Sequence, residues 1–156
     1  MAETKVAMWR SVRKEDFTTV LTQEGAPVVG VLYPDFERKL ITGGKRKGQY
    51  RPPDVTTFVD EVDGENVQFV RSGGGTSLFD KKDVFGTVYW RCFEIPAGTV
   101  IDGGLFLKGP DTSTAVPDAN HYQVEPRARI MTVAAYKGAL DNFARAAVAR
   151  SVELAK

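Results

Sequence analysis

A small set of cationic, hydroxyl and aromatic side chains is spaced along the sequence in a combination that suits a dinucleotide. Arg10 lies in the first apolar segment, and Arg51 precedes two prolines. The run Gly75–Ser77 (GTS) closes a glycine-rich stretch, and the only histidine, His121, is followed by Tyr122. Arginine makes paired hydrogen bonds to phosphate, glycine-rich loops bind anions through backbone N–H groups, and tyrosine stacks on flat rings. We therefore expect these residues to bind a diphosphate and a flat base.

Other chemistries find less support in the spacing of the residues. Gly44-Lys45 is not a phosphate-binding loop, because Lys39 stands where a glycine is required and Arg46 stands where a hydroxyl residue is required. The basic stretch around it is a solvated loop or steers an anionic ligand. No G-x-S-x-G sequence is present, so a serine hydrolase is not indicated.

Length and composition restrict the class of protein. The 156 residues predict one domain, residues 1–156, and the formal charge of +1 argues against a general nucleic-acid or membrane-surface protein. A single cysteine, Cys92, excludes an internal disulfide and a multi-cysteine metal site, and we expect no metal. No apolar run is long enough to cross a membrane, so we expect no membrane insertion. No cleavable signal peptide is visible, so if the protein is exported, it must use another route.

The order of elements predicts an α+β fold, with a split antiparallel β core followed by one long C-terminal helix. Short apolar or alternating segments predict strands, and these are residues 5–12, 27–33, 67–70, 87–95 and 121–125. Thr76 or Ser77 is expected to cap a short helix over residues 78–82. The long helix is expected over residues 133–154, capped by Thr132. The helical period places four apolar side chains on its inner face: Tyr136, Leu140, Phe143 and Ala147.

Four motifs occur in a characteristic order: Gly74–Asp80 (GGTSLFD), Ile95–Thr99 (IPAGT), His121-Tyr122 and Leu140–Phe143 (LDNF). Together they resemble a toxin family of type VI secretion effectors within the ADP-ribosyltransferase-like superfamily. The resemblance is good over residues 70–156. In the first half it is weaker and rests on Trp9-Arg10 and Arg51–Asp54 (RPPD).

The resemblance implies a compact NAD-binding fold, toxicity inside a target cell and neutralisation by a cognate immunity protein. Arg10 matches the first-strand arginine of the superfamily. Positions that matter in the toxin family are matched by Arg51, Thr76, Ser77 and His121. Most members of the superfamily carry a catalytic glutamate on a late strand, for which the toxin family has no obvious equivalent. Glu125 is the candidate here, although it matches no position of the family.

These implications give an expected mechanism. NAD is the substrate: its diphosphate binds Arg10 or Arg51, Thr76 and Ser77 support its nicotinamide ribose, and Gly75 also belongs to the binding site. The expected catalytic residues are His121, Ser77 and Glu125. His121 and Tyr122 order the nucleotide, and Glu125 stabilises the ribosyl cation before ADP-ribose passes to a protein or nucleic acid in the cytoplasm of the target cell. Three alternatives stay open: a non-catalytic domain that binds a nucleotide or a protein, an NAD hydrolase, and a nucleic-acid-acting domain that uses Arg38–Arg51.

Overall fold

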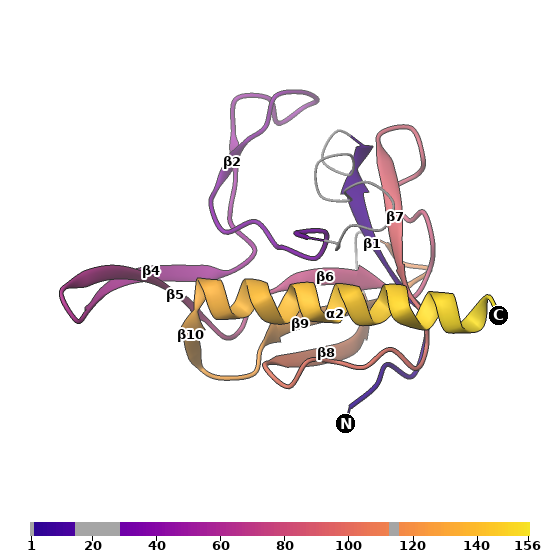
Figure 1. The fold of residues 1–156 in the computed structure, drawn as a ribbon. Helices are drawn as coiled ribbons and strands as arrows, with labels where there is room; N and C mark the ends of the chain where they lie inside the picture. The colour runs from indigo at the N-terminus through magenta and orange to yellow at the C-terminus, as the bar shows by residue number, and fades with distance from the viewer. Residues whose placement is uncertain (1, 15–28, 113–115) are drawn as a thin grey trace.

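The central element of the fold is a five-stranded antiparallel sheet with the strand order β7-β1-β6-β9-β8 (Figure 1). The computed structural model describes residues 2–14, 29–112 and 116–156. The strands of this sheet are β1 (Met8–Arg13), β6 (Thr76–Phe79), β7 (Trp90–Ile95), β8 (Leu105–Thr112) and β9 (Asn120–Pro126). β6 lies in the middle of the sheet, between the earliest strand and a late one, so residues far apart in the sequence become neighbours.

The register of β6 and β9 decides which side chains share a face. Phe79 pairs with His121 and Ser77 pairs with Gln123. Because side chains alternate along a strand, these residues lie on one face of the sheet. Leu78, which lies between Ser77 and Phe79 in the strand, points to the other face and is fully buried. One face of the sheet is therefore core and the other is available for a site.

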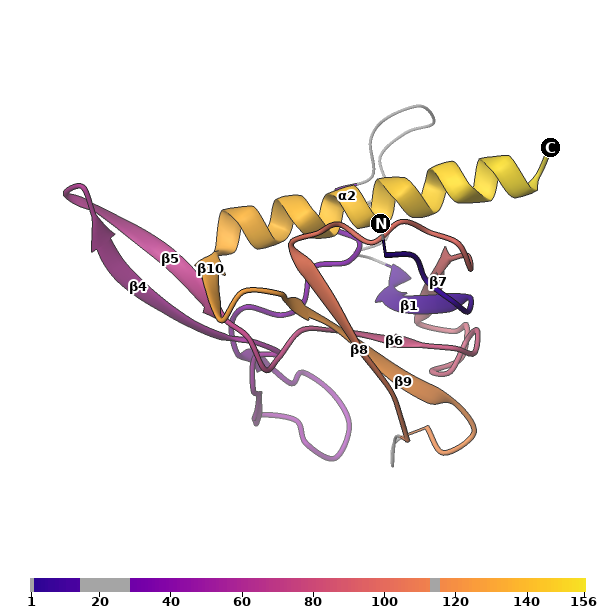
Figure 2. The same ribbon diagram turned by 90° about the horizontal axis from the view of Figure 1, so that it is seen from below.

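The helix α2 (Val133–Leu154) covers the core face of the sheet (Figures 1 and 2). Its N-cap is Thr132, whose Oγ1 accepts a hydrogen bond from the backbone N–H of Ala135 at 3.1 Å. The four apolar residues expected to face inward are all fully buried: Tyr136, Leu140, Phe143 and Ala147. Burial of each large apolar side chain contributes about 1.5–3 kcal/mol, so this face is the main attachment of the helix.

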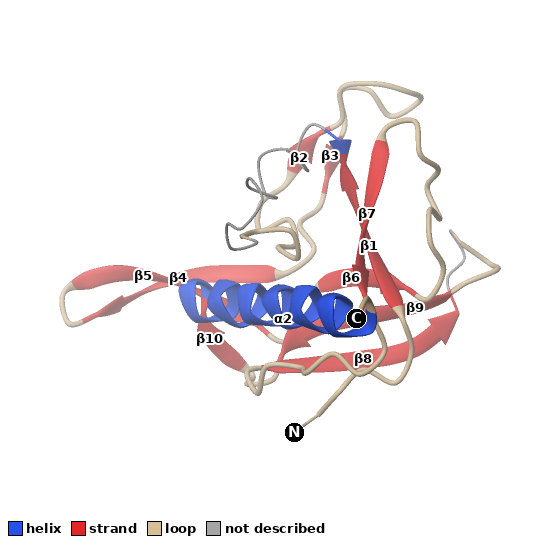
Figure 3. Cartoon of the chain, turned by 45° about the vertical axis from the view of Figure 1, so that its right-hand side comes forward, coloured by secondary structure: helices blue, strands red, loops and turns tan. Residues whose placement is uncertain are grey.

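Two smaller sheets complete the fold. β4 (Thr56–Val62) and β5 (Glu65–Arg71) form a hairpin that projects from the body, and β10 (Ile130–Thr132) pairs with β5. The hairpin turns at Asp63 and Gly64, both with positive φ. β2 (Lys39–Leu40) and β3 (Tyr50–Arg51) form a second, shorter ribbon on the side of the molecule where β1 and β7 extend (Figure 3).

The structure confirms the α+β class, the antiparallel sheets and the long C-terminal helix. The short helix expected over residues 78–82 is wrong, because Thr76–Phe79 is strand β6, paired on both sides. The strand expected over 87–95 begins only at Trp90. In the expected strand 27–33, residues 27 and 28 lie outside the described residues, and the rest forms a turn at Gly30 (φ 81°).

Candidate functional site

A cavity of about 360 Å³ is lined by residues of β1, β3, β6 and β7 and of neighbouring loops, and we call it the inner cavity. Its lining combines two arginines, two aspartates, two serines and three aromatic rings: Arg10, Ser11, Asp35, Arg51, Asp54, Ser77, Phe79, Phe85 and Trp90. A larger outer cavity of about 910 Å³ shares Arg10, Ser11, Asp35, Arg51 and Trp90 with it. The two form one cleft, because they share these side chains. Their volumes suit a small-molecule ligand.

Arg10 is held at the base of this cleft by two backbone carbonyls. Its Nη1 donates to the Ser77 oxygen at 3.3 Å and its Nη2 donates to the Tyr33 oxygen at 3.2 Å. Its Nε is buried and has no hydrogen-bond partner among the described residues. Burial lowers the pKa of Arg10, while Asp54 and Asp35 oppose that shift. A buried donor without a partner costs free energy, so this guanidinium is suited to receive an acceptor from a ligand.

Ser77 and His121 form a direct pair beside the inner cavity. Nε2 of His121 lies 2.9 Å from Oγ of Ser77, and the imidazole packs on the Phe79 ring with 5.3 Å between centroids. Burial lowers the pKa of His121, with Asp111 acting in the opposite direction. The imidazole is therefore neutral at pH 7, and it can accept or donate one proton in the bond to Ser77. Of the two side chains, Ser77 lines the inner cavity.

Arg51 closes the mouth of the cleft through two aspartates. Its Nη1 lies 3.7 Å from Asp35 and its Nη2 lies 3.4 Å from Asp54, while over half of its side chain stays exposed. The two aspartates are also joined through the backbone, since the Asp35 N–H donates to the Asp54 carboxylate at 2.8 Å and the Asp54 N–H donates to the Asp35 carbonyl at 2.8 Å. This pairing brings two carboxylates and an exposed cation to the same part of the cleft.

Aromatic rings form one side of the inner cavity. Phe79 and Phe85 meet edge to face at 5.7 Å, and Phe85 lies 5.4 Å from Trp90. The guanidinium of Arg13 lies over the Trp90 ring at 5.2 Å. Phe85 is 46% exposed, which is high for a residue in an aromatic cluster. This surface can stack a flat ring that enters the cavity.

The structure gives Gly75 and Thr76 positions inside the sheet. Thr76 is fully buried, and its Oγ1 donates to the backbone carbonyl of Leu32. A Cβ atom on Gly75 would meet the Val124 carbonyl oxygen at 2.0 Å, so only glycine allows β6 and β9 to approach each other here. Gly75 and Thr76 position the strand next to Ser77, and neither residue lines the cleft.

Tyr122 and Glu125 also stand apart from the cleft lining. Alternation along β9 turns Tyr122 away from His121, and its ring packs against the core cluster. Glu125 shares the His121 face and is nearly buried, at 6% exposure. Its carboxylate accepts the Gly73 N–H at 2.8 Å and an amide hydrogen of Gln123 at 3.4 Å. Of the described residues, the acidic side chains that line the inner cavity are instead Asp35 and Asp54.

Residues 30–36, which we call the cleft wall, are bonded directly to α2. Asp141 of α2 accepts the Gly30 N–H at 2.8 Å and the Tyr33 hydroxyl at 2.7 Å. Burial and the bond to Asp141 raise the pKa of Tyr33 to about 12. The ammonium group of Lys137 lies 5.2 Å from the Tyr33 ring and 5.1 Å from that of Phe36. The wall that holds Arg10 through the Tyr33 carbonyl is thus positioned by α2.

Two of the motifs singled out in the sequence have structural explanations. In LDNF, Leu140 and Phe143 are fully buried and Asp141 anchors the cleft wall. In IPAGT, the hydroxyls of Thr99 and Thr4 both donate to the Pro96 carbonyl, at 2.6 and 2.8 Å. Sequence reasoning missed Asp35, Phe79, Phe85 and Trp90 as cavity residues. The sequence did offer a pointer to Asp54 as a site residue, because Asp54 ends the RPPD motif.

Two general findings accompany this geometry. Within residues 2–14, 29–112 and 116–156, no helix is both long and apolar enough to span a membrane. In the same ranges, no three histidine, cysteine, aspartate or glutamate side chains gather in a way that could hold a metal ion.

Comparison with known proteins assigns the family. The sequence model described as Tse2 ADP-ribosyltransferase toxin matches residues 5–152, nearly the whole chain. A search of curated proteins found no match. The chain therefore belongs to the Tse2 ADP-ribosyltransferase toxin family, whose namesake is a type VI secretion effector.

Proposed function

We propose that this member of the Tse2 family uses NAD as a substrate in the cleft and transfers its ADP-ribose to a macromolecule. The observation that supports this most directly is Arg10, whose buried Nε has no partner among the described residues and which lines a cavity together with Ser77 and three aromatic rings. The core draws on residues from Met8 to Ala147, so we also propose that residues 1–156 act as one functional domain.

Arg10 and Arg51 are the residues that would hold the diphosphate. Arg10 is held by two backbone carbonyls, and its Nε has no partner among the described residues. Arg51 is exposed and pairs with Asp35 and Asp54 at distances above 3.3 Å. A phosphate that enters the cleft offers Arg51 shorter, charge-assisted bonds. The rings of Phe85 and Trp90 would stack on the nicotinamide.

The chemistry of NAD itself is the loss of nicotinamide. The bond between ribose C1′ and the ring nitrogen breaks, the electron pair leaves with nicotinamide, and the ribose becomes cationic before the acceptor attacks. A carboxylate beside that position stabilises the charge. Asp35 and Asp54 both line the inner cavity, and we assign this role to Asp54 because it ends the RPPD motif, whereas Glu125 is bound to Gly73 outside the lining.

Two matched substitutions separate these carboxylates. Asp54→Asn and Glu125→Gln each remove one charge and preserve the shape of the side chain. We expect Asp54→Asn to slow nicotinamide release at least tenfold, about 1.4 kcal/mol, and Glu125→Gln to change it less than threefold. A larger loss of nicotinamide release in Glu125→Gln than in Asp54→Asn would identify Glu125, the candidate from the sequence, as the catalytic carboxylate.

Ser77 and His121 are proposed to orient the ribose. The Ser77 hydroxyl lines the cavity, and its bond to the neutral imidazole of His121 fixes where its lone pairs and proton point. The backbone carbonyl of the same residue holds Arg10. Ser77 thus sets the relative position of the phosphate and ribose subsites.

The proposal is tested with NAD labelled separately in its nicotinamide and its adenylate. The purified protein and a cell lysate are incubated with each label, and released nicotinamide and labelled macromolecules are measured. A transferase releases nicotinamide and labels a macromolecule. Release without a labelled product identifies an NAD hydrolase, and no release in either mixture identifies a domain that acts by binding alone.

Family membership also supports a cellular setting. A type VI effector acts in the cell that receives it, so we propose that this chain acts in the cytoplasm of the target cell and is neutralised by an immunity protein in the producer. Co-expression tests this: a neighbouring gene product that restores growth and forms a stable complex with the chain is the immunity protein.

A further inference from the structure

Residues 38–51, which we call the basic segment, concentrate positive charge in a protein with little net charge. The segment holds six of the 21 lysine and arginine residues and no aspartate or glutamate. The whole chain has a formal charge of only +1, so the rest of it is net acidic. The near-neutral total therefore hides a strongly basic element.

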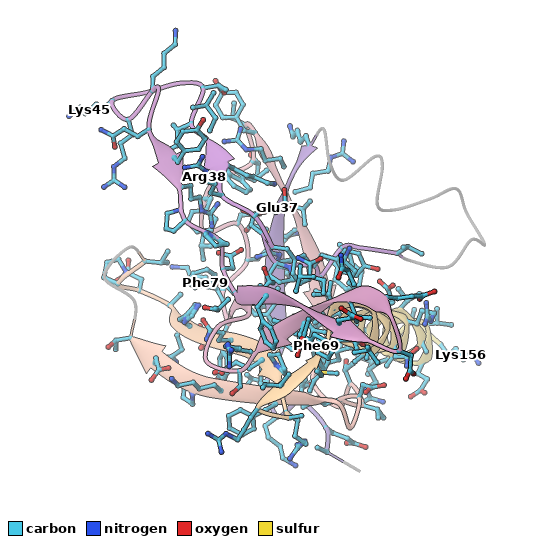
Figure 4. All side chains as sticks on the ribbon, turned by 90° about the vertical axis from the view of Figure 1, so that its left-hand side faces the viewer. Glu37, Arg38, Lys45, Phe69, Phe79 and Lys156 are labelled. Carbon is cyan, nitrogen blue, oxygen red and sulfur yellow. The ribbon has the colours of Figure 1, made fainter. Side chains whose placement is uncertain are left out.

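The basic segment forms part of the cleft. Residues 39–44 line the outer cavity, which shares Arg10 and Arg51 with the inner cavity. The segment is a ribbon made by β2 and β3, and its outer end carries Lys45, which points away from the body (Figure 4). A ligand that lies along the ribbon therefore leads from the solvent to the proposed NAD site.

Most of these cations have no acidic partner within the described part of the chain. Lys39 and Arg51 pair with Asp35. Lys45, Arg46 and Lys47 are exposed and make no ion pair among the described residues. Like charges this close repel each other, which a polyanion would relieve.

An exposed aromatic ring lies among the cations. The guanidinium of Arg38 lies 4.1 Å from the centre of the Tyr50 ring, and Tyr50 is 53% exposed. Proteins that bind single-stranded nucleic acids combine a cationic track with aromatic or arginine planes on which bases stack. A single-stranded nucleic acid would use both features, because its phosphates pair with the lysines and its bases stack beside the exposed Arg38–Tyr50 pair.

We propose that the acceptor of ADP-ribose is a single-stranded nucleic acid that binds along the basic segment. This inference rests on the proposed function for its transfer step. An oxygen or nitrogen of the nucleic acid forms the new bond to ribose C1′ and releases its proton to solvent, while the electron pair of the broken bond leaves with nicotinamide. Apart from Arg51, which is proposed to hold the NAD diphosphate, the basic segment acts in binding the acceptor and does not contact the reacting atoms.

The test uses a triple variant and a control matched in charge. Lys45→Gln, Arg46→Gln and Lys47→Gln together remove three charges from the outer end of the segment. The control removes three charges from exposed positions elsewhere, Lys5→Gln, Arg129→Gln and Lys156→Gln. Both proteins are compared with the unmodified chain in the binding of fluorescent 20-mer DNA and RNA single strands, in nicotinamide release without acceptor, and in transfer of labelled ADP-ribose.

We expect the triple variant to bind either single strand at least tenfold more weakly and the control less than threefold more weakly. Each lost phosphate contact lowers the slope of log affinity against log salt by about 0.7, so the slope should fall by about 2 in the triple variant. Nicotinamide release should stay within twofold in both variants, while transfer to nucleic acid falls only in the triple variant.

Equal binding by all three proteins would overturn the inference, as would labelled protein in place of labelled nucleic acid with intact nicotinamide release. Failure of the proposed function has a different signature, because the unmodified chain would then release no nicotinamide. The strand-binding measurement needs no NAD, so the role of the basic segment is decided in that case too.

Discussion

Oγ of Ser77 and Nε2 of His121 lie 2.9 Å apart, joined across the β6–β9 pairing at the edge of the inner cavity. We expect Ser77→Ala and His121→Ala each to lower nicotinamide release at least tenfold, about 1.4 kcal/mol of transition-state stabilisation. Because the two side chains act as one pair, the double variant should lose little more than either single variant. A double variant whose losses multiply would show that the residues act separately.

The same pair predicts a dependence on pH. Burial places the pKa of His121 below its ordinary value of 6.5, so the folded protein favours the neutral ring. Protonation favours the unfolded chain, and the contribution of this residue to stability is therefore lost as the pH falls from 6.5 through the folded pKa. Activity that needs the neutral ring should fall in the same acidic range. Titration of the single histidine by NMR locates the transition, and a folded-state pKa above 6.5 would contradict the assignment.

Arg51→Ala should weaken NAD turnover without unfolding the protein. Loss of a charge-assisted bond to phosphate costs about 2 kcal/mol, or roughly 30-fold in turnover at low NAD concentration. Its pairs with Asp35 and Asp54 are exposed, and such pairs contribute only about 0–1 kcal/mol to stability. Arg129→Ala, at another exposed position, is the matched control. Unchanged turnover by a folded Arg51 variant would remove it from the site.

Phe143→Ala should destabilise the fold by about 3–5 kcal/mol, because Phe143 lies on the inner face of α2 and is fully buried. Val148→Ala on the same helix should cost far less, since Val148 is 40% exposed. Chemical denaturation of both variants measures the difference. Equal midpoints would mean that the helix packs through another face.

Gly75→Ala distinguishes a glycine that binds ligand from one that permits strand contact. The added methyl would meet the Val124 carbonyl, so we expect a loss of stability of at least about 2 kcal/mol. Gly43→Ala should be nearly neutral, because no atom of the described residues lies within 4 Å of the added Cβ. A Gly75 variant with normal stability and lost NAD binding would point to direct contact with the ligand.

The local sequence pattern was sufficient to predict the long helix and the side chains on its inner face. Periodicity and the Thr132 cap are properties of neighbouring residues, and α2 has the predicted bounds. Thr76–Phe79 was misread as the start of a helix because hydroxyl residues favour helix caps. In the fold, the Thr76 hydroxyl bonds to Leu32, 44 residues away, and no local signal encodes that contact.

The distinction between local pattern and long-range contact also explains which site residues the sequence could predict. Arg10, Arg51, Ser77 and His121 were predicted from residue type and resemblance, and the structure places them at or beside one cleft. The partnership of Asp35 with Asp54 was not predictable, because it depends on reciprocal backbone bonds between two loops. Glu125 was chosen for its position on the His121 face, but the pattern could not indicate that Gly73 binds its carboxylate.

The attachment of Tyr33 to Asp141 sets a sequence of events during synthesis. The two residues are 108 positions apart, and a ribosome adding about 5–20 residues each second needs on the order of 5–20 s to pass from one to the other. Until then the cleft wall lacks its bonds to α2, while the bonds from Thr76 and Asp54 are already available to hold it. The cleft therefore reaches its complete form only after α2, the last element in chain order, has been made.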